Sequence, residues 1–164
     1  MAKHILSVLT ENKAGVLSRI SGLFSRRGFN IDSLAVGTTQ DESISRMTIV
    51  VNGDDYIVEQ VCKQLNKLID VIKIKRLDDN DTVSRELSLI KVAANNKTRS
   101  DIIQIVDIFR AKIIDVSHET LTIEMTGTEE KHQALIDLLT PYEIKEMVKT
   151  GTVSIERGTN IISK

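Results

Sequence analysis

The sequence has few of the residues that define several common classes of protein. Among its 164 residues there are one cysteine, one proline, no tryptophan and only 3% aromatic residues. A single cysteine, Cys62, cannot form an internal disulfide, and this usage is typical of a reducing compartment. So few aromatic rings leave little surface on which single-stranded bases could stack. The apolar runs are also short, far below the ~20 residues that a membrane-spanning helix needs.

An excess of charge of either sign is lacking as well. The net charge is −1 and the pI is about 6.3, whereas nucleic-acid-binding domains usually carry a basic excess. A strand-like run begins at His4, and no signal-peptide pattern precedes it. We therefore expect a cytoplasmic protein whose partners include neither nucleic acid nor a membrane.

Near its start the sequence changes from one hydrophobic period to another. Residues 4–10 are branched and apolar, which is typical of a strand. An apolar stripe at three- and four-residue spacing then predicts a helix. Its members are Val16, Leu17, Ile20, Leu23 and Phe24. Asn12 occupies a position where a helix cap is favoured, and Gly28 one where a left-handed C-cap is favoured.

Two strands, a second helix and a further strand are predicted next. Residues 30–39 and 45–51 have strand patterns, and residues 52–55 mark a loop and a helix start. The second helical stripe consists of Ile57, Val58, Val61, Leu65 and Leu68. Residues 71–77 then alternate as a fourth strand. The order βαββαβ predicts a ferredoxin-like unit, in which two helices cover one face of an antiparallel sheet.

The second half repeats this plan after an acidic run at residues 78–81. Strand patterns cover residues 86–93, 112–116 and 121–126, and helical patterns cover 102–109 and 129–139, with Pro141 ending the latter. Residues 144–148 and 153–155 are candidate terminal strands. We predict an α+β fold of tandem ferredoxin-like βαββαβ domains, at residues 1–77 and 84–164, joined by a linker at 78–83. At about eighty residues each, such domains have only marginal cores.

The side chains form no catalytic constellation. His4, His118 and His132 are not spaced as a helical metal pair, and a turn and an exposed helix start explain the last two better. Cys62 falls within the second helical pattern, where a half-buried thiol is a better interpretation than a nucleophile. Phosphate-loop, dinucleotide and nucleophile-elbow motifs are absent. We therefore predict no catalytic residue, no metal site and no cofactor in this chain.

Residues 12–34 contain the one candidate binding site. A helix start after Asn12 leaves backbone N–H groups for an anion, and Gly15 lets a ligand approach the backbone closely. Asn30 supplies both a donor and an acceptor. If the first two strands are neighbours, Asn12 and Asn30 can share a small zwitterion such as an amino acid. The alternative is purely structural, with the same residues serving as a cap, a turn and a strand entry.

Motifs spread over nearly the whole chain carry a family resemblance. They occupy residues 5–9, 12–19, 22–34, 45–49, 65–71, 84–87, 108–116, 126–128, 149–151 and 157–158. The run Asn-Lys-Ala-Gly-Val-Leu-Ser-Arg at residues 12–19 is the most specific of them. Together they closely resemble the ACT domain and, more narrowly, the small regulatory subunits of acetolactate synthase (acetohydroxyacid synthase). The match is weaker at residues 95–97 and 131–143.

The resemblance implies a non-catalytic homodimer whose N-terminal sheets join side by side and hold valine at their interface. Its partner would be the catalytic subunit of acetolactate synthase, carrying thiamine diphosphate, Mg²⁺ and FAD, in branched-chain amino acid biosynthesis. This chain would activate that enzyme and confer feedback inhibition. Carried over by position, the effector contacts are Asn12, Ala14, Gly15, Val16, Leu17, Asn30 and Ile31. The alternative is a free-standing amino-acid sensor that regulates another partner.

Overall fold

The computed structural model describes residues 2–163, and the chain divides into two compact units. The first unit consists of Met1–Val83 together with Thr152–Lys164, and the second of Ser84–Gly151. This division differs from the predicted domains in its last segment. The sequence pattern placed residues 152–164 in the second domain, whereas the structure returns them to the first. No helix within residues 2–163 is both long and apolar enough to cross a membrane.

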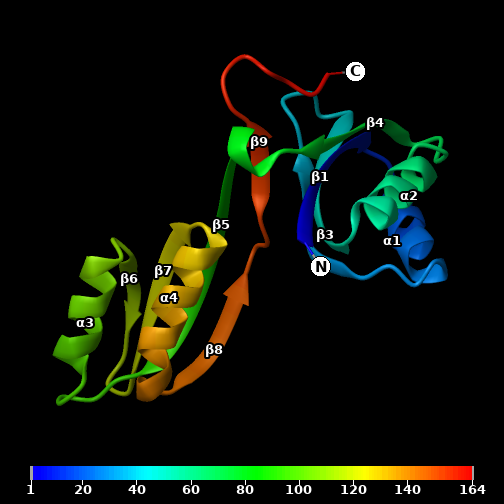
Figure 1. Ribbon diagram of the computed structural model, residues 1–164. Coiled ribbons are helices and arrows are strands. Elements are labelled where there is room, and N and C mark those ends of the chain that lie inside the picture. The colour runs from blue at the N-terminus through cyan, green and yellow to red at the C-terminus, as the bar shows by residue number, and fades with distance from the viewer. Residues whose placement is uncertain (1, 164) are drawn as a thin grey trace. The chain divides into compact units, whose positions relative to one another are not determined.

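The first unit is an antiparallel sheet with two helices on one face (Figure 1). Its strands are β1 (Ala2–Glu11), β2 (Ile31–Thr38), β3 (Ile44–Gly53) and β4 (Val71–Leu77), and its helices are α1 (Val16–Arg26) and α2 (Asp55–Leu65). The strand order is β2-β3-β1-β4, so β2 and β4 are the outer strands. The predicted βαββαβ order and ferredoxin-like fold are confirmed.

Both predicted helical stripes face the sheet and form one core. Alternate residues of β1 and β3 point toward the helices, as the period of a strand requires. The buried members are Leu6, Val8, Val16, Ile20, Leu23, Phe24, Met47, Ile49, Val51, Val58, Val61 and Leu65. Leu68, predicted as the last member of the α2 stripe, lies beyond the end of α2 but still packs against this core.

The two ends of α1 depend on glycines. Gly15 is the N-cap, with φ of 86° and no side-chain capping hydrogen bond. The prediction that Asn12 caps α1 is therefore wrong. At the other end Gly28 has a positive φ, and the Phe29 N–H donates to the Phe24 carbonyl oxygen at 3.0 Å. This is the glycine-terminated helix end that the sequence predicted.

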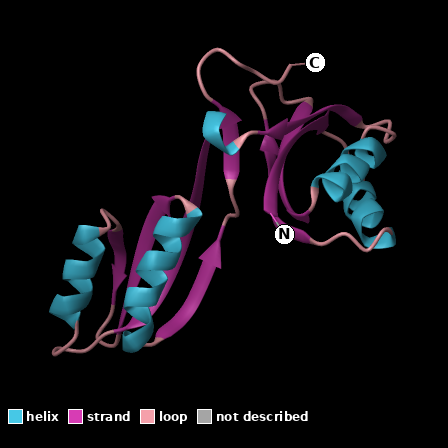
Figure 2. Cartoon of the chain, in the orientation of Figure 1, coloured by secondary structure: helices cyan, strands magenta, loops and turns pink. Residues whose placement is uncertain are grey.

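The second unit follows a short acidic turn and has the same plan (Figure 2). The turn is η1 (Asp79–Asp81), and β5 (Thr82–Ala93) begins directly after it, inside the predicted linker. The remaining elements are α3 (Arg99–Ile108), β6 (Lys112–Val116), β7 (Thr120–Gly127), α4 (Glu129–Leu139), η2 (Thr140–Tyr142) and β8 (Ile144–Lys149). The strand order β6-β7-β5-β8 mirrors that of the first sheet. The predicted tandem of two such units is thus present.

His132 is buried in the core of the second unit, between α4 and β5. It is 0% exposed, so the prediction that it belongs to an exposed helix start is wrong. The cause is spacing, since His132, Leu135 and Leu139 form the buried side of α4. The ring bridges the Ser88 hydroxyl, 2.8 Å from Nδ1, and the Glu86 carbonyl oxygen, 2.9 Å from Nε2. These bonds satisfy both nitrogens, so His132 has a structural role.

The last strand, β9 (Val153–Glu156), pairs with β5 and is grouped with the first unit. It lies over the face of the first sheet opposite the helices. Arg46 and Lys75 alternate with core residues of β3 and β4 and therefore point to this face. Arg46 Nη2 donates to the Ser154 carbonyl oxygen at 3.0 Å, and Lys75 Nζ lies 2.7 Å from Glu156 Oε2. Ser7, on the same face of β1, is 0% exposed. The C-terminal segment thus covers the second face of this sheet.

Candidate effector site

The predicted effector residues form two groups in the first unit. Asn12, Ala14 and Gly15 make the turn between β1 and α1, and Val16 and Leu17 begin α1. Asn30 and Ile31 lie at the start of β2. The structure brings the members of each group together.

The two groups lie at opposite ends of the sheet. Val51 of β3 pairs both with the start of β2 and with the start of β1, whereas the end of β1 pairs with the start of β3. Because β3 separates β1 from β2, those two strands run in the same direction. The length of β2, about 25 Å at the rise of a strand, therefore separates Asn12 from Asn30. The expectation that both contact one ligand within a single chain is wrong.

The Asn12 turn is held by the turn between β2 and β3. The Asn12 backbone N–H donates to the Ser43 carbonyl oxygen at 2.8 Å, and its side-chain Nδ2 donates to the Glu42 carbonyl oxygen at 2.8 Å. These bonds use the backbone N–H and one of the two side-chain N–H groups of Asn12. Within residues 2–163 its Oδ1 makes no hydrogen bond, so this oxygen can accept one from a ligand. Asn30 is exposed, and its Nδ2 donates to Asp32 Oδ1 at 3.0 Å.

The start of α1 can receive an anion. Gly15 provides no capping side chain, so the first N–H groups of the helix have no partner of that kind. Val16 is 3% exposed and faces the core, whereas Leu17 is 43% exposed. Of the predicted apolar contacts in this group, Leu17 can therefore offer its side chain to a ligand, and Val16 only its backbone.

Sequence reasoning missed two charged residues beside this turn, Arg19 and Asp70. Arg19 Nε donates to Asp70 Oδ2 at 2.6 Å, and a Cβ added to Gly15 would lie 3.0 Å from Arg19 Nη1. The spacing of four residues between Gly15 and Arg19 was the available signal, since it places both on one face of α1.

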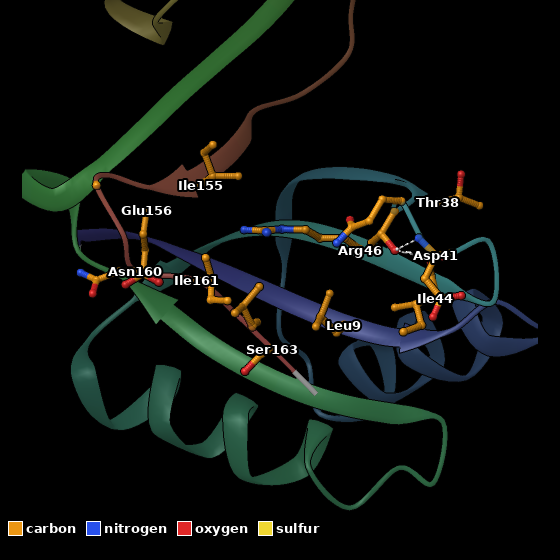
Figure 3. A pocket seen from close by; sticks show the side chains of 14 residues that line it. Leu9, Thr38, Asp41, Ile44, Arg46, Ile155, Glu156, Asn160, Ile161 and Ser163 are labelled. Atoms are coloured by element: carbon orange, nitrogen blue, oxygen red, sulfur yellow. Dashed lines mark hydrogen bonds between the residues drawn. The ribbon is translucent and has the colours of Figure 1, made fainter.

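A separate pocket of about 620 Å³ lies between the second face of the first sheet and the C-terminal segment (Figure 3). Leu9, Ile44 and Arg46 line one side, and Ile155 and residues 160–163 line the other. Burial lowers the pKa of the Arg46 guanidinium, and the neighbouring Glu156 carboxylate partly offsets this. None of the predicted effector residues lines this pocket, so it is distinct from the Asn12 turn.

Cys62 lies on α2 as a free, half-buried thiol. Burial raises the pKa of this thiol, and the positive charge of Arg76 opposes the shift. A raised pKa lowers the fraction of Cys62 present as thiolate at a given pH, and the thiolate is the nucleophilic form. The interpretation of Cys62 as a half-buried thiol is confirmed.

The sheet order, the helices on one face and the open helix start after β1 define a ferredoxin-like domain of the ACT class. The model of the AHAS small subunit-like ACT domain matches residues 6–73, and the model of the small subunit of acetolactate synthase matches residues 85–158. The two matches together extend from β1 into the segment after β9.

Relatives align along almost their full length. The acetolactate synthase small subunit of Mycolicibacterium smegmatis is 59% identical over 94% of this chain and 91% of its own. The probable small subunit of Archaeoglobus fulgidus is 55% identical over 95% and 98%. The crystal structure of the Thermotoga maritima small subunit superposes with a TM-score of 0.91 at 42% identity, covering 98% of this chain and all (100%) of that one. The chain belongs to the family of acetolactate synthase small (regulatory) subunits, and a small subunit implies a catalytic subunit as partner.

Proposed function

We propose that this chain is a cytoplasmic homodimer that binds valine between its two N-terminal units and thereby regulates acetolactate synthase. It activates a thiamine-diphosphate-dependent catalytic subunit, which carries the thiamine diphosphate, Mg²⁺ and FAD, and makes it sensitive to feedback inhibition by valine. One observation carries the site assignment. Asn30 directly precedes the outer strand β2, and Asn12 is held by the turn that follows β2. A twofold axis along β2 can bring the two asparagines together across two copies.

β2 is the outer strand suited to pairing with a second copy. Outer strands without a partner usually carry charged side chains that discourage pairing. β4 has Lys73, Lys75 and Arg76, whereas β2 has one charged residue, Asp32. β2 also exposes Val36, at 49%. An outer strand with a single charged residue and an exposed apolar side chain favours pairing through β2.

Twofold pairing through β2 completes the effector site. Both protomers use the same strand, so the two copies of β2 run antiparallel, and the start of one lies beside the end of the other. β2 ends at Thr38, next to the turn at residues 40–43 that holds Asn12. Asn30 of the partner subunit therefore reaches the Asn12 turn. The dimer has two such sites, each built from both chains.

The combined groups fit an aliphatic amino acid. N–H groups at the start of α1 donate to its carboxylate. The side-chain oxygens of Asn12 and the partner's Asn30 accept from its ammonium group. Leu17 and the partner's Ile31 enclose the isopropyl group, whose burial contributes about 1.5–3 kcal/mol when complete. Such a ligand links two protomers, so it can shift an equilibrium between arrangements of the dimer that differ in affinity.

A mixed dimer tests the shared site. Asn12→Ala and Asn30→Ala homodimers should each lose valine binding, because every site lacks one asparagine. When the two variants are co-expressed and the mixed dimer is purified by two tags, one site carries both substitutions and the other carries none. Calorimetry should therefore find about one valine per mixed dimer. No recovery of binding would contradict a site built from two chains.

An activity assay tests the regulatory role. The catalytic subunit alone should be slower than the reconstituted complex, and valine should inhibit only the complex. The Asn12→Ala variant should still activate while losing valine sensitivity. Equal turnover of pyruvate with and without this chain, or failure of the two subunits to co-purify, would overturn the proposed function.

A further inference from the structure

We propose that Arg19 is a further effector-binding residue, whose Nη1 donates to the carboxylate of the amino acid at the start of α1. This inference rests on the proposed function, because it concerns the same site. Arg19 lies one helical turn after Gly15, and its backbone N–H donates to the Gly15 carbonyl oxygen at 3.0 Å. The Arg19 side chain therefore begins within one helical turn of the segment that contains Asn12 and Gly15.

The guanidinium is fixed on one side and open on the other. Nε donates to Asp70 Oδ2 at 2.6 Å, and Nη2 lies 2.5 Å from the same oxygen. The side chain of Asp70 is 10% exposed, whereas that of Arg19 is 51% exposed. In the described part of the chain Nη1 has no hydrogen-bond partner. Nη1 is thus a free donor on a group whose orientation is already set.

Nη1 points over the helix start rather than away from it. A Cβ placed on Gly15 would come within 3.0 Å of Nη1. Nη1 therefore lies next to the Gly15 backbone, in space that a side chain would otherwise fill. A carboxylate that accepts from the N–H groups of this turn therefore also lies within reach of Nη1. Planar guanidinium groups commonly bind two acceptors on different edges.

The charges around the start of α1 favour binding of an anion. A helix N-terminus carries a partial positive charge, which makes a cation there unfavourable. Asp70 offsets the charge of Arg19 and is itself anchored, since its carbonyl oxygen accepts from the Glu11 N–H at 2.9 Å. The helix start still lacks a negative group of its own, because its first turn has no acidic residue. The effector carboxylate supplies that charge, and Asp70 acts as the positioning residue.

Calorimetry with two ligands separates this role from a structural one. The dimer is titrated with L-valine and with L-valinamide, which lacks the carboxylate. Arg19→Gln should weaken valine binding at least about tenfold, as expected for a hydrogen bond to a charged group, without weakening valinamide binding. Asp70→Asn should reduce the same preference for valine. Arg26→Gln, an exposed arginine on the same helix, is the matched control and should change neither affinity.

A crystal structure of the wild-type dimer with valine gives a second readout. A carboxylate oxygen should lie within about 3.2 Å of Nη1. A carboxylate farther than about 4 Å from Nη1, or an equal loss of affinity for valine and valinamide in Arg19→Gln, would overturn this inference and leave the proposed function standing. A wild-type dimer that binds no valine would overturn the proposed function itself.

Discussion

Position 15 requires a positive φ and the absence of a Cβ, and glycine is the one amino acid that meets both requirements. Its φ of 86° lies in the left-handed region, where an L-residue costs about 1–2 kcal/mol, and a Cβ there would crowd Arg19 Nη1 at 3.0 Å. We predict that Gly15→Ala lowers the free energy of unfolding of the first unit by about 1–2 kcal/mol and weakens valine binding. Urea unfolding and calorimetry measure the two effects. Gly22→Ala, inside α1, is the control and should preserve or raise stability. Equal losses in both variants would contradict this account.

Cys62 gives a prediction about pH. Because burial raises the pKa of the folded thiol, the unfolded chain ionises at lower pH than the folded one. The thiol therefore contributes stability below the unfolded pKa, and this contribution is lost as the pH rises through the folded pKa. We expect the rate of alkylation by iodoacetamide to have its pH midpoint at a higher value in the native protein than in guanidinium chloride. A native midpoint at or below the unfolded one would refute this expectation.

At the scale of elements, sequence patterns correctly predicted the helix ends that are set by residues close by in the sequence. α4 occupies Glu129–Leu139 as predicted, since Thr128 Oγ1 accepts from the Lys131 N–H at its start and Pro141 follows its end. The start of α1 was misplaced for the opposite reason. Asn12 has the composition of a cap, but its donors bind carbonyl oxygens at residues 42 and 43. These hydrogen bonds to the turn at residues 40–43 compete with capping of α1. Hydrophobic periodicity gives no information about contacts with a segment so distant in sequence.

β2 supports a prediction about assembly. Val36 is exposed on an outer strand whose one charged residue is Asp32. A twofold axis there would bring two copies of a charge at Val36 near each other. Val36→Asp should therefore convert the dimer to a monomer, in sedimentation equilibrium, without loss of the circular dichroism of the fold. Valine binding should be lost with the dimer. Tyr56→Asp, on exposed α2 surface, is the matched control and should remain dimeric. A dimeric Val36→Asp variant would argue against pairing through β2.

At the scale of the whole molecule, two features lay beyond the sequence pattern. The order of strands in a sheet is set by contacts between distant segments, and the sequence reasoning treated β1 and β2 as neighbours although β3 lies between them. For the same reason it placed Asn12 and Asn30 together in one chain. The strand at Val153–Glu156 was predicted, but its membership in the first unit was not. The sequence of a short amphipathic strand does not indicate which of two sheets it packs against.

The C-terminal segment should contribute to the stability of the first unit. A chain that ends at Gly151 loses the Ser154 carbonyl that accepts from Arg46 and the Glu156 carboxylate that pairs with Lys75. It also uncovers the buried Ser7. We expect the free energy of unfolding of this unit to fall by about 1–3 kcal/mol, measured by hydrogen exchange of β1 and β3 amides. A chain that ends at Gly158, which keeps β9, should lose less. Unchanged protection in the shorter chain would contradict this role.

The return of the chain has a consequence for its genetics. The backbone leaves the first unit after Val83 and re-enters it at Thr152, and the Arg157 N–H donates to the Asp81 carbonyl oxygen at 2.7 Å. The exit and the re-entry are therefore neighbours, and the second unit is a cassette inserted into the first rather than a module appended to it. A nonsense codon anywhere in the cassette also deletes the last strand of its host. Clean dissection requires excising the codons for residues 84–151 and rejoining the flanks with a short linker.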